Sequence, residues 1–247
     1  MTYHELQGLY LRIVSGITIV KYDGKEYHVY DPKTKHQLWG RKYYNEVYEK
    51  LISEGCLNEC QCEALLIEKG SWSVEQDQRI KDLEENLKKF NQQLPLLEFK
   101  SNEKKTVVRY IEVTKAEITR LNKIKNALLA NSAEYIARLE VYKRYLFWLT
   151  YNEYGEPVWQ NWFGFCQNDS NFINALLTEA YLENDLNDTN IRALARNEPW
   201  RSTWLTSCKT GHLFSHANCH MTDYQRTLVS WSLIYDNAFE HPECPSY

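Results

Sequence analysis

The sequence predicts a mainly helical α+β protein with an N-terminal β-hairpin, a central antiparallel coiled-coil helical hairpin and a C-terminal, aromatic-rich helical domain. Three observations lead to this prediction. An Asp-Gly pair separates two β-type segments near the N-terminus, apolar residues recur at intervals of three and four in the middle, and aromatic residues are frequent in the last part. We expect the divisions to be residues 1–72, 73–149 and 150–247.

The first thirty residues have the composition of β-strands. Leu9 to Val20 is rich in Leu, Ile, Val and Thr, and the alternating segment 26–30 follows it. Asp23-Gly24 between them is a typical hairpin turn. A two-stranded ribbon is marginal in water, so the hairpin should pack on a helix or pair with another chain.

Helical spacing begins after this hairpin. Apolar residues from Leu38 onward occupy one face until Gly55, and a short helix is expected over 59–68. Ser73 followed three residues later by Gln76 has the pattern of a capping box, which starts a new helix.

The central segment has the spacing of a coiled-coil seam. Burial of each seam residue stabilises by about 1.5–3 kcal/mol, whereas ordering each backbone residue costs about 1–2 kcal/mol. Two such helices are therefore marginal alone, and a third helix or a partner chain should lie against them. The three periodic runs are Ile80, Leu83, Leu87, Phe90 and Leu94; Val107, Ile111, Thr114, Ile118, Leu121 and Leu128; and Tyr135, Leu139, Tyr142, Leu146 and Leu149.

The last third begins with an aromatic segment, 150–165, whose large side chains indicate a buried connector. Three helices are expected after it, over about 171–184, 188–206 and 223–239. The last begins with Thr222 and Gln225 in capping-box spacing. Its apolar stripe consists of Tyr224, Leu228, Trp231, Tyr235 and Phe239.

Composition argues against several classes of protein. We find neither a signal peptide nor a run of eighteen apolar residues, so export and membrane insertion are not expected, and the seven cysteines indicate reduced thiols. Residues 74–145 contain 15 Lys and Arg against 11 Asp and Glu, whereas residues 146–247 contain 5 against 12. An excess of four positive charges over that length is too diffuse to predict nucleic-acid binding.

One cluster has donors suited to zinc: Cys208, His212, His216, Cys219 and His220. Tetrahedral Zn²⁺ prefers such Cys and His ligands, but the usual C-x2-C pair is missing. We favour separate surface histidines and keep a structural zinc site as the alternative. No metal or cofactor is therefore assigned.

Two other groups have competing interpretations. Cys56, Cys60 and Cys62 form one group, but Cys60 and Cys62 fall on different faces of the expected helix, which favours buried thiols over a shared metal site. Trp200 and Trp204 lie one helical turn apart. They are interpreted as core residues, with an exposed aromatic anchor for a partner as the alternative.

Catalytic signatures are absent from the sequence, including the P-loop, G-x-G-x-x-G, H-E-x-x-H and G-x-S-x-G patterns. We therefore expect no enzyme and name no catalytic or cofactor-binding residue. An enzyme of an unfamiliar type would need a deep pocket lined by perturbed titratable groups.

Three segments resemble an uncharacterised family of virion structural or tail-assembly proteins of large tailed bacteriophages, the myoviruses. They are 63–73 (EALLIEKGSWS), 194–204 around Pro199-Trp200, and 228–236 (LVSWSLIYD) followed by 242–246 (PECPS). The resemblance implies a tail or baseplate component with no active site, and a continuation beyond Tyr247 into an acidic segment. The Cys and His cluster is not part of the shared pattern.

The first hypothesis is thus a non-enzymatic bacteriophage virion or assembly protein, located in the virion or the host cytoplasm. Its expected partners are other phage structural proteins, in an oligomer or a larger assembly, with no membrane and no nucleic acid. The alternative is a regulatory phage protein, stabilised by zinc, that binds a host factor through its acidic C-terminal part.

Overall fold

The computed structural model describes residues 1–94, 97, 101–182, 186–210, 213–214 and 220–240. The chain forms two compact units: unit 1 contains residues 1–44 and 140–247, and unit 2 contains residues 45–139. The fold is mainly helical with one small antiparallel sheet, as the sequence predicts. Within these described ranges, no helix has the length and apolar character needed to span a bilayer.

The N-terminus of unit 1 is helical, which corrects the prediction of β structure before residue 17. Helix α1 (Tyr3–Ser15) begins with a capping box in which Thr2 and Glu5 exchange hydrogen bonds. It ends at Gly16, whose φ of 64° is the left-handed conformation that glycine adopts without a steric penalty. Leu6, Leu9 and Ile13 are its buried residues. The β-branched residues of segment 9–20 are therefore divided between helix α1 and the strand that follows Gly16.

The predicted hairpin is confirmed, and it has a third strand. Strands β1 (Ile17–Tyr22) and β2 (Lys25–Tyr30) pair antiparallel around the Asp23-Gly24 turn. Strand β3 (Thr150–Asn152) pairs with β2, so residues more than a hundred positions apart form one sheet. Because β3 has only three residues, period-two alternation could not reveal it.

The remaining elements of unit 1 are helical. The predicted helix 188–206 is two helices, α9 and α10, which are separated by a turn over residues 196–199. The elements are the first part of α2 (Thr34–Ser53), the second part of α6 (Ala133–Leu149), α7 (Trp162–Cys166), α8 (Ser170–Leu177), the π-helix η2 (Thr178–Leu182), α9 (Asp188–Ala195), α10 (Trp200–Thr210) and α11 (Asp223–Glu240).

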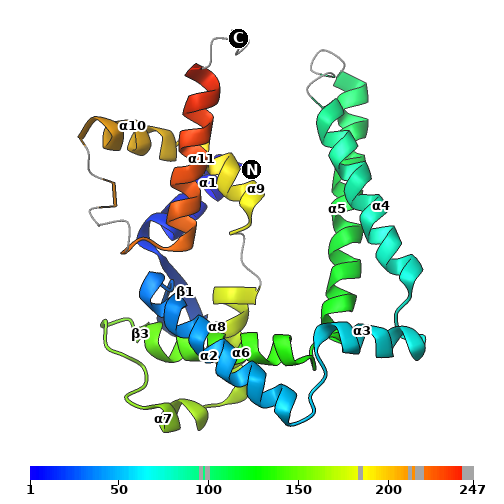
Figure 1. Cartoon of the computed structure of the whole chain (residues 1–247). Coiled ribbons are helices and arrows are strands. Elements are labelled where there is room, and N and C mark those ends of the chain that lie inside the picture. The colour runs from blue at the N-terminus through cyan, green and yellow to red at the C-terminus, as the bar shows by residue number, and fades with distance from the viewer. Residues whose placement is uncertain (95–96, 98–100, 183–185, 211–212, 215–219, 241–247) are drawn as a thin grey trace. The chain divides into compact units, whose positions relative to one another are not determined.

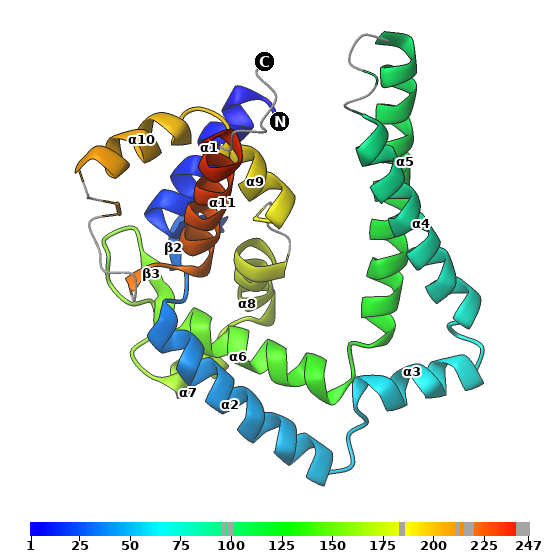
Figure 2. The ribbon, with the colours of Figure 1, turned by 45° about the horizontal axis from the view of Figure 1, so that its top comes forward.

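The core of unit 1 joins both ends of the chain. Figures 1 and 2 show α1, α9 and α11 side by side, and their apolar faces meet around Trp200 and Leu228, which are fully buried. The Trp200 indole N–H donates to the Ser232 hydroxyl at 2.7 Å. Trp204 is 5% exposed and donates to the Asp236 carboxylate. The interpretation of both tryptophans as core residues is therefore confirmed.

Unit 2 consists of helices close in sequence. After the second part of α2 come α3 (Glu59–Glu68), α4 (Val74–Gln93) and α5 (Ser101–Leu128), and the first residues of α6 follow. The predicted capping box at Ser73 and Gln76 begins α4. Helices α4 and α5 lie antiparallel to each other (Figure 1), which confirms the predicted helical hairpin.

The two units differ from the three divisions expected at residues 72/73 and 149/150. Residues 1–44 belong with the C-terminal part because β2 pairs with β3 and α1 packs on α9 and α11. Such long-range packing has no signature in local periodicity.

Candidate functional sites

The seam of the α4–α5 hairpin contains the predicted apolar residues. Ile80, Leu83 and Leu121 are buried together with Trp72, and Leu66 of α3 packs against them. Farther along, the Phe90 and Tyr110 rings stack with centroids 6.0 Å apart. The seam thus holds the hairpin together from its base to this ring pair.

An ion-pair network closes the base of the hairpin. Lys125 Nζ donates to Glu63 Oε1 and to Asp77 Oδ1, each at 2.7 Å. Partial burial opposes ionisation of Asp77, but the hydrogen bonds around its carboxylate, that with Lys125 first among them, and the positive charge of Lys125 together outweigh it, so the pKa of Asp77 is lowered. The pKa of Lys125 is raised because both carboxylates outweigh its own desolvation.

The expected third helix does not complete the hairpin. Only residues 133–139 of α6 belong to unit 2, and they contact its base, where the Ala133 N–H donates to the Leu57 carbonyl at 2.9 Å. The apolar face of α6 with Val141, Tyr145 and Leu149 is buried in unit 1 instead. Within unit 2, helix α3 covers part of the seam through Leu66.

Helix α5 has an additional apolar stripe outside the seam. Tyr110, Val113 and Ile124 are 56%, 60% and 38% exposed. At 3.6 residues per turn Val113 and Ile124 lie about a quarter turn from the seam, and Tyr110 lies between them and the seam, where its ring also stacks on Phe90. We call these three residues the outer stripe. Between them, Glu117 and Arg120 form an exposed ion pair.

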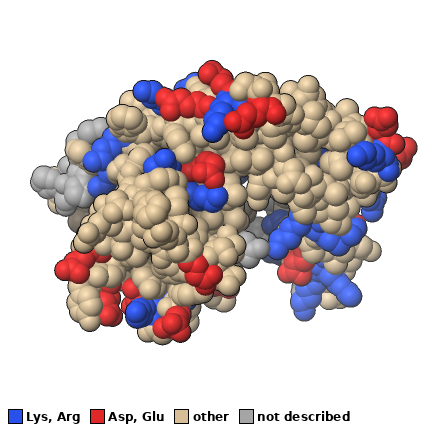
Figure 3. Space-filling model, turned by 90° about the horizontal axis from the view of Figure 1, so that it is seen from below, with Lys and Arg blue, Asp and Glu red and all other residues tan. Residues whose placement is uncertain are grey.

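Positive charges border the outer stripe. Lys105 and Arg109 are exposed and lie on the side of the stripe that faces away from the seam. Figure 3 shows Lys and Arg side chains gathered on the part of the surface that belongs to α3–α5. The edge of the stripe is therefore basic, although the excess of charge is small.

A second candidate site is a cavity in unit 1, where five segments meet. Asp31 follows β2, is 4% exposed, and accepts two hydrogen bonds from Arg12 of α1, at 2.8 and 2.7 Å. Its backbone N–H donates to the Gly16 carbonyl at 2.8 Å. The paired and hydrogen-bonded carboxylate joins the end of α1 to the end of β2.

The start of α11 is fixed at the same place. Thr222 and Gln225 form the predicted capping box. The Gln225 amide also donates to the carbonyls of Ile13 and Val14, at 3.1 Å each, in the last turn of α1. A capping motif that was visible in the sequence thus also joins the two ends of unit 1.

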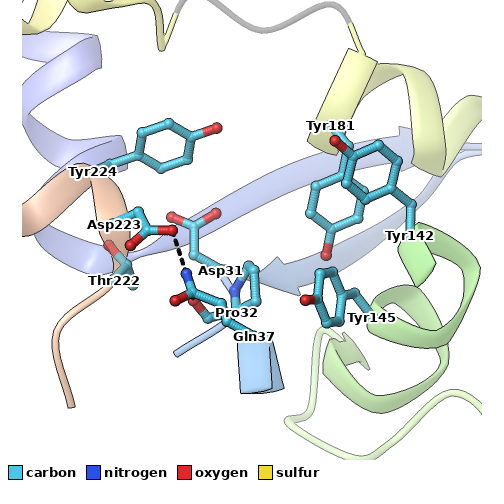
Figure 4. Close-up of a pocket in the computed structure, with 9 residues that line it drawn as sticks. All are labelled: Asp31, Pro32, Gln37, Tyr142, Tyr145, Tyr181, Thr222, Asp223 and Tyr224. Atoms are coloured by element: carbon cyan, nitrogen blue, oxygen red, sulfur yellow. Dashed lines mark hydrogen bonds between the residues drawn. The ribbon is translucent and has the colours of Figure 1, made fainter. Parts of the chain in front are cut away.

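Three tyrosines form the opposite wall (Figure 4). Tyr142 and Tyr145 project from α6, and Tyr181 comes from η2. Tyr142 and Tyr181 stack with centroids 5.1 Å apart and planes 8° from parallel. Gly40 of α2 permits this wall, because a Cβ there would collide with the Tyr145 phenol.

The resulting cavity has a volume of about 270 Å³. Figure 4 shows Asp31 between the wall of tyrosines and the start of α11, where Asp223 and Tyr224 line the cavity. We call it the tyrosine cavity. Asp223 pairs with Arg226 and accepts from the Gln37 amide.

Tyr181 is the most perturbed group in the cavity. Its hydroxyl is shielded from solvent and has no hydrogen-bond partner within the protein. Burial and the nearby Asp31 carboxylate raise its pKa well above the ordinary value of 10.0, and Arg12 offsets only part of this effect. Tyr181 is therefore a neutral phenol at physiological pH and is no general base.

The cavity has some of the features that an enzyme of unfamiliar type would need, namely a pocket of measurable volume and a perturbed titratable group. The Thr222 hydroxyl is a candidate nucleophile in this cavity, but it caps α11 and accepts a hydrogen bond from the Gln225 N–H. The two carboxylates of the cavity, on Asp31 and Asp223, each pair with an arginine. This arrangement suits binding better than general acid–base chemistry.

The predicted metal and thiol groups have different outcomes. His212, His216 and Cys219 lie outside the described residues, whereas Cys208 and His220 are exposed. Cys60 is also exposed, which corrects its interpretation as a buried thiol, and Cys56 and Cys62 are half-buried. Among the residues that the structure describes, no three His, Cys, Asp or Glu side chains converge as metal ligands.

The residues of the tyrosine cavity come from segments between positions 31 and 224. Local patterns predict Tyr142 and Tyr224 only as members of helical stripes and Thr222 only as a cap, so they do not indicate that these residues meet. Comparison of the chain with protein-family models, with curated proteins and with solved structures finds no match.

Proposed function

We propose that this chain is a non-enzymatic assembly protein that works by binding other protein chains, and that the α4–α5 hairpin is its contact surface. The observation that supports this proposal is the outer stripe. Val113 is 60% exposed and Tyr110 is 56% exposed, although the seam of the same helix already packs against α4. A second apolar stripe on a coiled-coil helix is the usual feature of a site for an additional helix.

The proposed occupant is an amphipathic helix of another chain. Val113 follows Tyr110 by three residues and Ile124 follows Val113 by eleven, three turns further along the same face, with the Glu117–Arg120 ion pair between them. Because Lys105 and Arg109 border the stripe, the partner helix carries acidic residues along its edge. The narrow seam supports the same proposal, since two helices of this kind are marginal without further cover.

We further propose that the partner is a structural component of a tailed-bacteriophage particle. Support for this step comes from the three sequence segments that resemble myovirus virion or tail-assembly proteins. The alternative role, binding of a host regulatory factor, would use the same stripe but a different partner.

Photo-crosslinking in infected cells tests the proposal. A benzoylphenylalanine at position 113 would sit on the outer stripe, and the same group at position 115 provides the matched control, because Lys115 is exposed on the opposite side of α5. We expect a crosslink from position 113, and none from 115, to a protein that is also found in purified particles. Val113→Glu should weaken this complex at least tenfold, whereas Lys115→Glu should not.

The other outcomes separate the two parts of the proposal. A specific crosslink from position 113 to a host protein alone would replace the virion role by the regulatory one. Equal crosslinking from positions 113 and 115, or none from either, would show that the hairpin is not the contact surface.

A further inference from the structure

We propose that the tyrosine cavity is a binding site for a small organic ammonium ion, which the aromatic rings and carboxylates of unit 1 recognise. This inference is independent of the α4–α5 hairpin. It rests on the chemistry of the cavity wall, on its size and on the buried Tyr181 hydroxyl that lacks a partner.

The wall has the composition that binds organic cations. Tyr142, Tyr145, Tyr181 and Tyr224 provide aromatic rings, and Asp31 and Asp223 provide carboxylate oxygens. The negative faces of aromatic rings attract ammonium groups, most strongly where the groups are shielded from water. Asp31 is 4% exposed and already accepts two hydrogen bonds from Arg12, so an ammonium group would share a carboxylate that is shielded from water.

An anion fits the cavity less well. Arg12 and Arg226 are engaged by Asp31 and Asp223 and are not among the residues that line the cavity. The positive end of the α11 dipole is capped by Thr222 and faces the Asp223 carboxylate. No cationic group is therefore left to hold a carboxylate or phosphate within this lining.

A purely apolar ligand also fits the cavity less well, because it would leave the Tyr181 hydroxyl without a hydrogen-bond partner. A buried hydroxyl without a hydrogen bond costs free energy, and natural sites seldom keep one without a reason. Tyr181 is one of the residues that line the cavity, as is Asp31. A ligand that has both an ammonium group and a hydroxyl or N–H group would satisfy the Tyr181 hydroxyl.

The size of the cavity sets the scale of the ligand. A volume of about 270 Å³ is slightly below the usual range for drug-sized molecules. The ligand is thus a small amine or quaternary ammonium compound, and not a long polyamine or a peptide.

Binding measurements on the full chain with defined probes test the proposal. Choline carries a quaternary ammonium and a hydroxyl, 3,3-dimethylbutan-1-ol is its uncharged isostere, n-butylammonium is a thinner cation, and acetate is an anion. We expect choline or n-butylammonium to bind in calorimetry or ligand-observed NMR, and the neutral isostere to bind about tenfold more weakly than choline. Acetate should not bind.

Two variants locate the binding. Tyr181→Phe removes one oxygen and should weaken choline binding about three- to tenfold without loss of stability, since that hydroxyl has no partner to lose. Tyr145→Leu removes a ring and should weaken it at least tenfold. Tyr154→Phe is the matched control, because Tyr154 is 80% exposed and lies outside the cavity.

The proposal is overturned by either of two results. One is the absence of binding by both cations at concentrations up to about 10 mM, where a Kd near 1 mM is still detectable. The other is binding that Tyr181→Phe and Tyr145→Leu leave unchanged while both variants retain the circular dichroism spectrum of the parent. Equal affinity for choline and its neutral isostere would likewise exclude recognition of the charge.

Discussion

The two units of this protein are stabilised in different ways. Unit 1 brings together residues from both ends of the sequence around large, fully buried side chains such as Trp200 and Leu228. Unit 2 uses neighbouring helices, a narrow seam and the ion pairs of Lys125. The difference means that a wide core joins the two ends of the chain in one unit, whereas the thin seam of the other leaves apolar side chains such as Val113 exposed to solvent.

The largest effect is expected from Trp200→Ala in unit 1. Removal of this fully buried ring leaves a cavity, and such changes cost about 3–5 kcal/mol of unfolding free energy. Hydrogen exchange should show faster opening of α1, α9 and α11 but not of α4 and α5. Trp39→Ala is the control, with an expected change below about 0.5 kcal/mol, because Trp39 is 60% exposed.

Leu121→Ala should destabilise unit 2 and leave unit 1 unchanged, with a somewhat smaller effect than Trp200→Ala. Leu121 is 5% exposed in the seam, and its truncation should destabilise unit 2 by about 2–4 kcal/mol. Ile124 lies three residues after Leu121 but belongs to the outer stripe, so Ile124→Ala should reduce the unfolding free energy of the isolated protein much less. Faster hydrogen exchange in α11 after Leu121→Ala would contradict the separate stabilisation of the two units, because it would mean that they unfold together.

The smallest effect concerns acid. The pKa of Asp77 is lowered in the folded protein, so its contribution to stability is present above the ordinary pKa of an aspartate, near 4, and is lost as the pH falls through the lowered value. The partly buried Asp77–Lys125 pair should contribute about 1 kcal/mol. Urea unfolding between pH 2 and pH 6 should show this loss for unit 2 in the parent.

The control for this prediction is Asp77→Asn, which removes the titrating group and keeps its shape. Its stability should depend less on pH over the same range. An equal acid dependence in parent and variant would assign the effect to other carboxylates.

The helices of unit 2 could be predicted because their signals are local. The seam residues from Ile80 to Leu94 recur at intervals of three and four, and the Ser73–Gln76 box marks where α4 begins. In α1 the local signals conflicted: the β-type residues from Leu9 onward outweighed the box formed by Thr2 and Glu5. The helix prevails because Leu6, Leu9 and Ile13 then share one buried face.

The tyrosine cavity could not be predicted for a different reason. Asp31 appears in the sequence only as the residue before Pro32, and Tyr181 as one aromatic among many. Their proximity depends on the pairing of β2 with β3 and on the hydrogen bonds from Gln225 to the end of α1. Such contacts join positions about 120 to 210 residues apart, beyond the reach of any periodic pattern.

The discontinuous make-up of unit 1 also has a consequence for synthesis on the ribosome. Residues 1–44 emerge first but lack the surfaces of α9 and α11, which are translated last. Unit 2 has all its helices by residue 139 and can fold while the rest is still being made. The middle of the nascent chain can therefore fold before α9 and α11 are made, and the apolar residues of α1 lack their packing partners until then.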